Sequence, residues 1–252
     1  MRIYFVASAQ HNAPFGSTPI RGDCQQLTNP MPIGDALRAL IVAMDRWVVE
    51  GTPPPPSRIP RVSDGTLVPS KQKSTGFPWI SGVRYNGLYN RQFFLDYGPN
   101  LLRGQIGIHP PRPIKNGRYK ILVPKVDADG NDVAGIRLPI IRVPVATHTG
   151  WNLQCKELAE DELCGLLGSY IPFPETKEER ERSGDPRLSI EERYNDHADY
   201  VQKVSHAARA MVEEKFLPPE DAERIIEEAK KNCCLVRESY RKGEIVATNP
   251  WA

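Results

Sequence analysis

The stretch RIYFVASAQH, residues 2–11, is the most informative part of the sequence about the fold. Its first part is short, apolar and rich in β-branched and aromatic side chains, and it ends abruptly in small and polar residues. This pattern is typical of a buried β-strand, which we predict over Arg2–Ala7. A signal peptide is the alternative, because Ala7-Ser8-Ala9 resembles a cleavage site, but the apolar run is shorter than the roughly 7–15 residues that a signal peptide needs.

An amphipathic helix is predicted after this strand, over Ile33–Glu50, because its apolar side chains recur at the helical period. Gly51 stands where a left-handed residue commonly ends a helix, and the prolines at residues 53–56 prevent the helix from continuing. The connection between strand and helix, Ser8–Pro32, is so long that we expect it to be functional or an insertion.

The remainder of the chain combines irregular, β-rich and helical segments. Residues 57–118 carry many aromatic side chains among glycines and prolines, so we expect coil packed on a body. Two β-rich runs, Tyr119–Val126 and Ile136–Val145, flank a turn cluster and predict a β-hairpin. Helices are expected over Glu157–Leu167, from the Ser189 capping box to about Phe216, and from Pro219 to about Asn232, the last two forming an αα-hairpin.

Composition and charge exclude several classes of protein. The 252 residues include 33 Lys and Arg against 31 Asp and Glu, and the net charge of +2 excludes a polybasic nucleic-acid-binding protein. No apolar run approaches the ~20 residues that cross a bilayer, so no membrane span is expected. The five cysteines cannot all pair within one chain, and we expect free or partly paired thiols that indicate no compartment.

Several motifs resemble a known family. The order of strand, loop with Gln10-His11, and amphipathic helix resembles the last strand, catalytic-histidine loop and final helix of the α/β-hydrolase fold. The stretches Tyr4–His11 and Gly51–Arg58 look like the C-terminal half of α/β-hydrolase domain proteins and are distantly similar to tannase and feruloyl esterases. Six further stretches resemble the C-terminal extension of that family: Val126–Asp132, Gly135–Pro139, Thr149–Leu153, Ser169–Phe173, Gly184–Pro186 and Glu191–Tyr194.

The resemblance implies a fold and a role for one residue. The fold class would be α/β, with a partial α/β-hydrolase unit (last strand and final helix) over residues 1–56. An irregular α+β extension with a β-hairpin and a C-terminal αα-hairpin would follow over residues 57–252. His11 would be the triad histidine, which takes the proton of a catalytic serine. The implied reaction is hydrolysis of carboxylic esters, without a cofactor.

The sequence departs from the family at the nucleophile. It holds no G-x-S-x-G motif, and only ten residues precede His11. In the family, the serine and the acid lie upstream of the histidine strand. We therefore predict a truncated product, a fragment or one part of a split protein, without its nucleophile and acid and inactive by itself, so whether it is an enzyme stays open. Without neighbouring strands, Ile3–Val6 and the helix would expose apolar surface, which favours self-association or binding of an upstream hydrolase polypeptide.

Further candidate residues lie after the predicted hairpin. His148, Trp151 and Asn152 form a polar and aromatic cluster that would line a substrate cleft, unless Trp151 only anchors its loop. The run Asp127–Asp132 resembles a calcium loop but lacks glycine at the sixth position, so a turn is favoured and no metal site is predicted. No glycine-rich phosphate loop is present, and we expect no nucleic acid partner.

A second hypothesis comes from a different class of function. From about Ser57 onward, the aromatic coil, the hairpin and the helical hairpin would pack as one body that covers a catalytic domain or binds a partner, with no chemistry of its own. Ester turnover that depends on His11 would favour the hydrolase, and binding to an upstream-encoded polypeptide without such turnover would favour the covering module.

Overall fold

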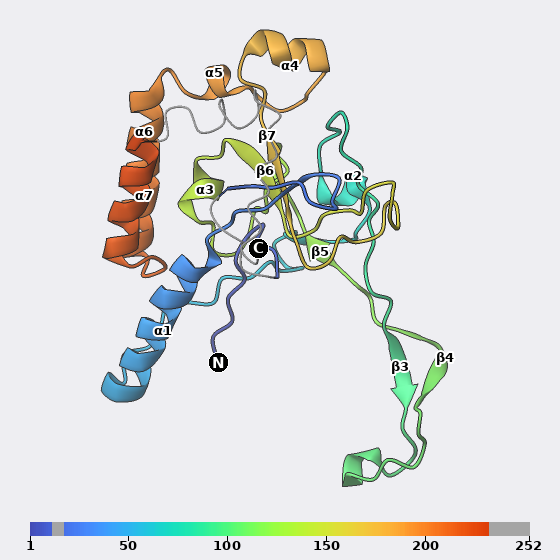
Figure 1. Ribbon diagram of the computed structural model, residues 1–252. Coiled ribbons are helices and arrows are strands. Elements are labelled where there is room, and N and C mark those ends of the chain that lie inside the picture. Colours follow the sequence, from blue (N-terminus) through green and yellow to red (C-terminus); the bar gives the residue numbers. More distant parts are fainter. Residues whose placement is uncertain (12–17, 232–252) are drawn as a thin grey trace, which may run out of the picture.

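The computed structural model describes residues 1–11 and 18–231 (Figure 1). Asn232, Cys233 and Cys234 lie outside these residues, so the predicted helix from Pro219 is described only to Lys231. In chain order the elements are β1 (Leu27–Thr28), α1 (Ile33–Glu50), β2 (Leu67–Val68), α2 (Gln72–Thr75), β3 (Phe93–Asp96), the 3-10 helix η1 (Leu101–Arg103), β4 (Arg112–Arg118), β5 (Val123–Pro124), α3 (Pro139–Arg142), β6 (Ala146–Thr149), β7 (Ser169–Pro172), α4 (Lys177–Ser183), α5 (Ile190–Arg193), α6 (His197–Glu213) and α7 (Pro219–Lys231).

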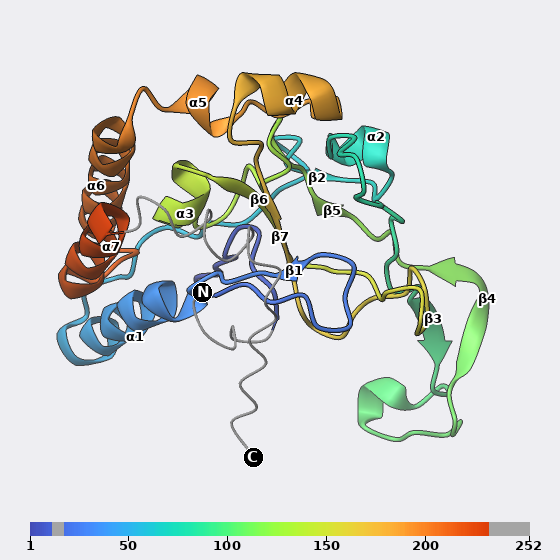
Figure 2. The ribbon, with the colours of Figure 1, turned by 45° about the horizontal axis from the view of Figure 1, so that its top comes forward.

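A small antiparallel sheet lies at the centre of the molecule, in the order β1-β7-β6 (Figure 2). His148 of β6 lies opposite Tyr170 of β7, and Leu27 of β1 lies on the other side of Tyr170. All four residues of β6 are buried, which suits a strand covered on both faces. A disulfide between Cys24 and Cys164 joins the segment before β1 to the segment before β7. The expectation of partly paired thiols is confirmed within the described residues, where Cys155 is free.

The main core lies between the sheet and the helices on its left in Figure 1. The start of α1 packs there with α3 and with α6 and α7, two consecutive helices that contact each other (Figures 1 and 2). The buried side chains of this core are Met31, Ala36, Ile136, Leu138, Ile141, Ala208, Met211, Phe216, Leu217, Ala222 and Ile226. Ion pairs fasten α1 to α7, because Asp35 and Asp221 are both buried and both contact Arg38 and Arg224.

The predicted helix over Ile33–Glu50 is confirmed, with Gly51 in the left-handed conformation (φ 71°) just after it. The expected exposed apolar surface is also present. Only the first turns of α1 are buried, while Ile41 and Val48, farther along, are 68% and 76% exposed. None of the helices in the described part of the chain is long and apolar enough to cross a membrane.

The prediction of a sheet strand over Arg2–Ala7 is wrong for the described residues. The segment is extended, but it makes only two isolated parallel bridges, between Tyr4 and Arg58 and between Val6 and Ile136. The bridge to Arg58 cannot extend, because the next donor would be Pro60 and proline has no N–H. The bridge to Ile136 lies just before helix α3, which begins at Pro139. The half-buried segment therefore lies between two irregular stretches, and no parallel sheet forms in the part of the chain that is described.

The predicted β-hairpin between Tyr119–Val126 and Ile136–Val145 is also wrong. β5 pairs with β2, and the second run contains helix α3, whose first residue is Pro139. Proline fits the start of a helix and interrupts a strand ladder. The turn between the two runs is confirmed, because Val126 bridges Asp132 and Asp127 Oδ1 accepts hydrogen bonds from the N–H groups of Asp129 and Asn131. The hairpin lies instead between β3 and β4, inside the stretch expected to be coil.

The helix predictions of the C-terminal third are partly confirmed. No helix forms over Glu157–Leu167, where Asp161 has a positive φ of 68° and Leu163 bridges Leu153. The Ser189 capping box is present, with both of its hydrogen bonds to Glu192, but α5 ends after one turn. A new helix, α6, begins at His197, because Asp196 caps it by accepting the N–H of Asp199.

Candidate functional site

The backbone that leads to His11 is fixed at Ser8. Ser8 has a positive φ of 58°, which is uncommon for a residue with a side chain. Its N–H donates to Asp132 Oδ2 at 2.6 Å, and the N–H of Asp132 donates back to Ser8 Oγ at 2.8 Å. Asn29 Nδ2 donates to the carbonyl oxygen of Ser8 at 2.8 Å. Three hydrogen bonds from two distant segments therefore hold the turn three residues before His11.

His11 itself lies at the surface, and its side chain is exposed. Within residues 1–11 and 18–231, neither a hydrogen bond nor an ion pair reaches its ring. Ala9, two residues earlier, lines the cavity described below. His11 itself is not among the lining residues, so the described residues offer an accessible imidazole without a nucleophile or a carboxylate bonded to it.

A second histidine, His148, is fully buried in β6 and packs edge-on against the ring of Tyr170 at 5.3 Å. Its Nδ1 lies 2.8 Å from Asn29 Oδ1. Since Asn29 Nδ2 donates to two carbonyl oxygens, the amide oxygen faces the imidazole and accepts, so Nδ1 carries the proton. Burial lowers the pKa of His148 to about 3, so this ring is neutral at physiological pH.

The remaining nitrogen of His148, Nε2, is covered by neighbouring atoms and has no hydrogen-bond partner in the described structure. His148 contributes to the cavity lining, but its Nδ1 is hydrogen-bonded to Asn29 and its Nε2 is shielded by neighbouring atoms. A neutral ring with a shielded lone pair is poorly placed to accept a proton from a ligand. Its contacts bind the sheet to the turn at Ser8 through Asn29.

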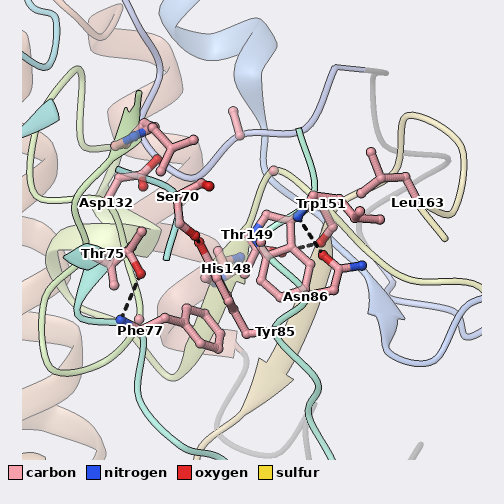
Figure 3. Close-up of a pocket in the computed structure, with 18 of the residues that line it drawn as sticks. Ser70, Thr75, Phe77, Tyr85, Asn86, Asp132, His148, Thr149, Trp151 and Leu163 are labelled. Carbon is pink, nitrogen blue, oxygen red and sulfur yellow. Dashed lines mark hydrogen bonds between the residues drawn. The ribbon is translucent and has the colours of Figure 1, made fainter. Parts of the chain in front are cut away.

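A cavity of about 310 Å³ opens beside β6 (Figure 3). Three aromatic rings form its apolar wall: Phe77, Tyr85 and Trp151 contact one another with centroid separations of 5.4 to 5.6 Å. Tyr85 is held in place because its hydroxyl donates to the carbonyl oxygen of Ser70 at 2.8 Å. A pocket with an aromatic wall and a few polar groups is the usual form of a small-molecule site.

Asp132 is the carboxyl group among the residues that line this cavity (Figure 3). Burial raises its pKa to about 6, and the hydrogen bond from Ser8 opposes that rise only in part. The residue is therefore a carboxyl group that gains or loses its proton near neutral pH. Sequence reasoning assigned Asp132 to a turn and missed it as a site residue. Its partner Ser8 lies 124 residues away, a separation that no local pattern reveals.

The predicted substrate cluster of His148, Trp151 and Asn152 is only partly brought together. Trp151 lines the cavity beside His148. Asn152 is buried but does not line it, because its amide bonds to the backbone of Gln26 and of Gly168. The Asn152 contacts are those of a residue that fastens β1 to the segment before β7.

The acidic turn is satisfied by arginines. Asp127 pairs with Arg137 at 2.8 Å, and Asp129 pairs with Arg193. Asn131 is fully buried, with its side-chain oxygen accepting the N–H of His148. Among the residues that the structure describes, no three His, Cys, Asp or Glu side chains gather as a metal site would require.

Comparison with known proteins identifies one family. The family model described as "alpha/beta hydrolase domain" matches residues 1–227, which is most of the chain. Neither the curated proteins nor the solved structures include a significant match.

Proposed function

The chain belongs to the alpha/beta hydrolase domain family, and on this premise we propose that it supplies the catalytic histidine, His11, of a carboxylic-ester hydrolase. The serine and the acid of the triad would lie outside residues 1–252, so these residues alone would not turn over esters. One observation carries the proposal. His11 is an exposed imidazole that follows a turn fixed by three hydrogen bonds, and no catalytic partner bonds to it within the described residues.

The anchoring of the His11 turn supports this role. A general base must be presented at a defined position, and a loop achieves this only when its backbone is fixed. Ser8 is fixed on both sides, by Asp132 and by Asn29, while the imidazole beyond it has no bond in the described structure. His148, by contrast, is buried and bonded to Asn29.

The exposed face of α1 supports a packing partner outside residues 1–252. From its second turn onward the helix exposes apolar side chains, from Leu37 at 47% through Met44 at 64% to Val49 at 74%. A surface helix of a complete domain presents polar residues on its outer face. We therefore propose that this face packs against the part of the hydrolase that carries the serine.

A covering or interaction module is the second candidate function, and the same exposed face of α1 favours it. In that case the chain would dock on a catalytic domain, and His11 would take no part in the reaction. The two candidates share a binding surface and differ only in whether His11 is needed for turnover.

The experiment measures hydrolysis of p-nitrophenyl butyrate by the chain alone and by its complex with an upstream-encoded polypeptide that carries G-x-S-x-G. The proposal predicts no turnover above buffer for the chain alone, and turnover by the complex that His11→Ala abolishes. His206→Ala is the matched control, because His206 is also exposed but lies on α6. An active complex that is indifferent to His11→Ala would refute the catalytic role and leave the covering role.

A further inference from the structure

One segment of the chain contributes to neither the core nor the cavity wall, except where it joins the rest of the molecule. Residues 88–122, called the arm here, carry the β3–β4 hairpin, which projects away from the rest of the molecule in both views (Figures 1 and 2). Its two strands pair only with each other, and from residue 91 to residue 120 only Gly117 is buried. An isolated two-stranded ribbon is marginally stable in water, so this arm gains from a surface to bind.

The arm is strongly basic, although the chain as a whole is nearly neutral. It holds six basic residues and one acidic residue, a net charge of +5, so the remaining sequence carries −3. None of the six pairs with a carboxylate in the described structure, and Arg118 lies instead over the ring of Phe93 at 4.8 Å. The six are Arg91, Arg103, Arg112, Lys115, Arg118 and Lys120. Unneutralised charge on a projecting element attracts an anionic partner.

The tip of the arm is apolar. Leu102 is completely exposed, and Leu101 and Ile106 beside it are 42% and 59% exposed. The tip loop is closed at its neck, where the N–H groups of Gly107 and Ile108 both donate to the carbonyl oxygen of Tyr97. Gly98 has a positive φ of 98° and approaches Gly107 so closely that an added Cβ would lie 3.2 Å from its Cα. The loop thus holds apolar side chains at the outermost point of a basic ribbon.

We propose that the arm docks on an anionic lipid surface, with Leu101 and Leu102 entering the interface and the basic residues contacting the headgroups. Two features favour lipid over other anionic partners. Nucleic acid would use the charges but not the leucines, and a protein would need an apolar socket lined by acidic residues at the same spot. A bilayer offers both apolar depth and surface charge to any projecting tip. The net negative remainder of the chain would be repelled, which orients the arm toward the surface.

The experiment measures co-sedimentation of the protein with vesicles of phosphatidylcholine alone and of phosphatidylcholine mixed with phosphatidylserine. We expect binding to the mixed vesicles to be at least about tenfold tighter, and to weaken at high salt. The double variant Leu101→Asp/Leu102→Asp should lose about tenfold or more of this affinity. Arg112→Glu with Lys115→Glu should lose at least about fivefold for each residue, the effect of removing one basic charge, because the new carboxylate adds repulsion. Leu102→Trp should add tryptophan emission that shifts to the blue on the mixed vesicles alone.

Matched control variants lie off the arm. Leu188→Asp changes a leucine that is 48% exposed, and Arg182→Glu with Lys156→Glu reverses two exposed, unpaired charges, so these variants should bind as the unchanged protein does. Far-UV circular dichroism checks that every variant is folded. Equal binding to both vesicles, or equal loss in arm and control variants, would overturn the proposal. A dimer that forms without lipid, seen by light scattering, and that dissociates in the arm variants would also overturn the proposal, because the arm would then dock on a second copy.

Discussion

Replacing the buried histidine His148 by glutamine should remove a large part of the acid sensitivity of this fold. The neutral ring donates from Nδ1 to Asn29 and packs against Tyr170, with its pKa lowered to about 3 from 6.5. In the unfolded chain the same residue gains a proton as the pH falls below 6.5. The folded state binds fewer protons between pH 6.5 and pH 3, so the stability that His148 contributes is complete above pH 6.5 and is lost as the pH falls.

The size of the effect follows from the shift in pKa. One pKa unit corresponds to about 1.36 kcal/mol, so at about pH 4 the histidine lowers the free energy of unfolding by about 3 kcal/mol relative to pH 7. His148→Gln keeps a donor for Asn29 but loses the ring contact, which should cost about 2 kcal/mol at neutral pH. The variant should therefore be the less stable protein at pH 7 and the more stable one at about pH 4, with the two curves crossing near about pH 5.

The assay is urea unfolding of both proteins at several pH values between these limits. Asp132 and the other carboxyl groups titrate in both proteins, so their contributions cancel in the difference. His206→Gln, at an exposed position on α6, is the control and should follow the unchanged protein. Parallel curves for the unchanged protein and His148→Gln would refute the buried neutral ring.

Three further predictions test the neighbouring contacts. The pKa of Asp132 is raised to about 6, so its ionisation lowers the free energy of unfolding by up to about 3 kcal/mol as the pH rises through 6. Asp132→Asn lacks this carboxyl group, so in urea unfolding its stability relative to the unchanged protein should increase between pH 4 and 7. A difference that stays constant over this range would contradict the prediction. Replacing Cys24 and Cys164 by alanine removes a cross-link between residues 140 positions apart and should lower the free energy of unfolding by about 3–5 kcal/mol. If a reductant leaves the melting temperature of the unchanged protein unaltered, the disulfide is absent. Gly150→Ala would place its Cβ 2.7 Å from the carbonyl oxygen of Ala9, so it should cost about 1–3 kcal/mol in thermal unfolding, and an unchanged melting temperature would show that this approach is looser.

Features that depend on neighbouring residues could be predicted from the sequence. The helix over Ile33–Glu50 has an apolar stripe and a terminal glycine, and the structure reproduces both of its ends. The capping box at Ser189 also depends only on a residue three positions later, Glu192. Such signals involve residues within one or two helical turns of each other, so the contacting residues are close together in the sequence.

Features that depend on distant partners could not be predicted in this way. β-rich composition suggested strands over Arg2–Ala7 and Ile136–Val145, but prolines on the partner or within the run stopped the ladders. The site was incomplete for the same reason, because the bonds between Ser8 and Asp132 join residues 124 positions apart. Of the predicted site residues, His11 reaches the surface, His148 and Trp151 line the cavity, and Asn152 does not.

Labelling with a fluorophosphonate, followed by mass spectrometry of the digested protein, shows whether residues 1–252 contain an activated serine. The reagent modifies a serine only where a neighbouring base activates it. If the nucleophile that His11 would activate lies outside residues 1–252, the chain alone will carry no labelled serine, and the unchanged protein and His11→Ala will give the same result. Stoichiometric labelling of one serine in this chain, lost in His11→Ala, would contradict the account.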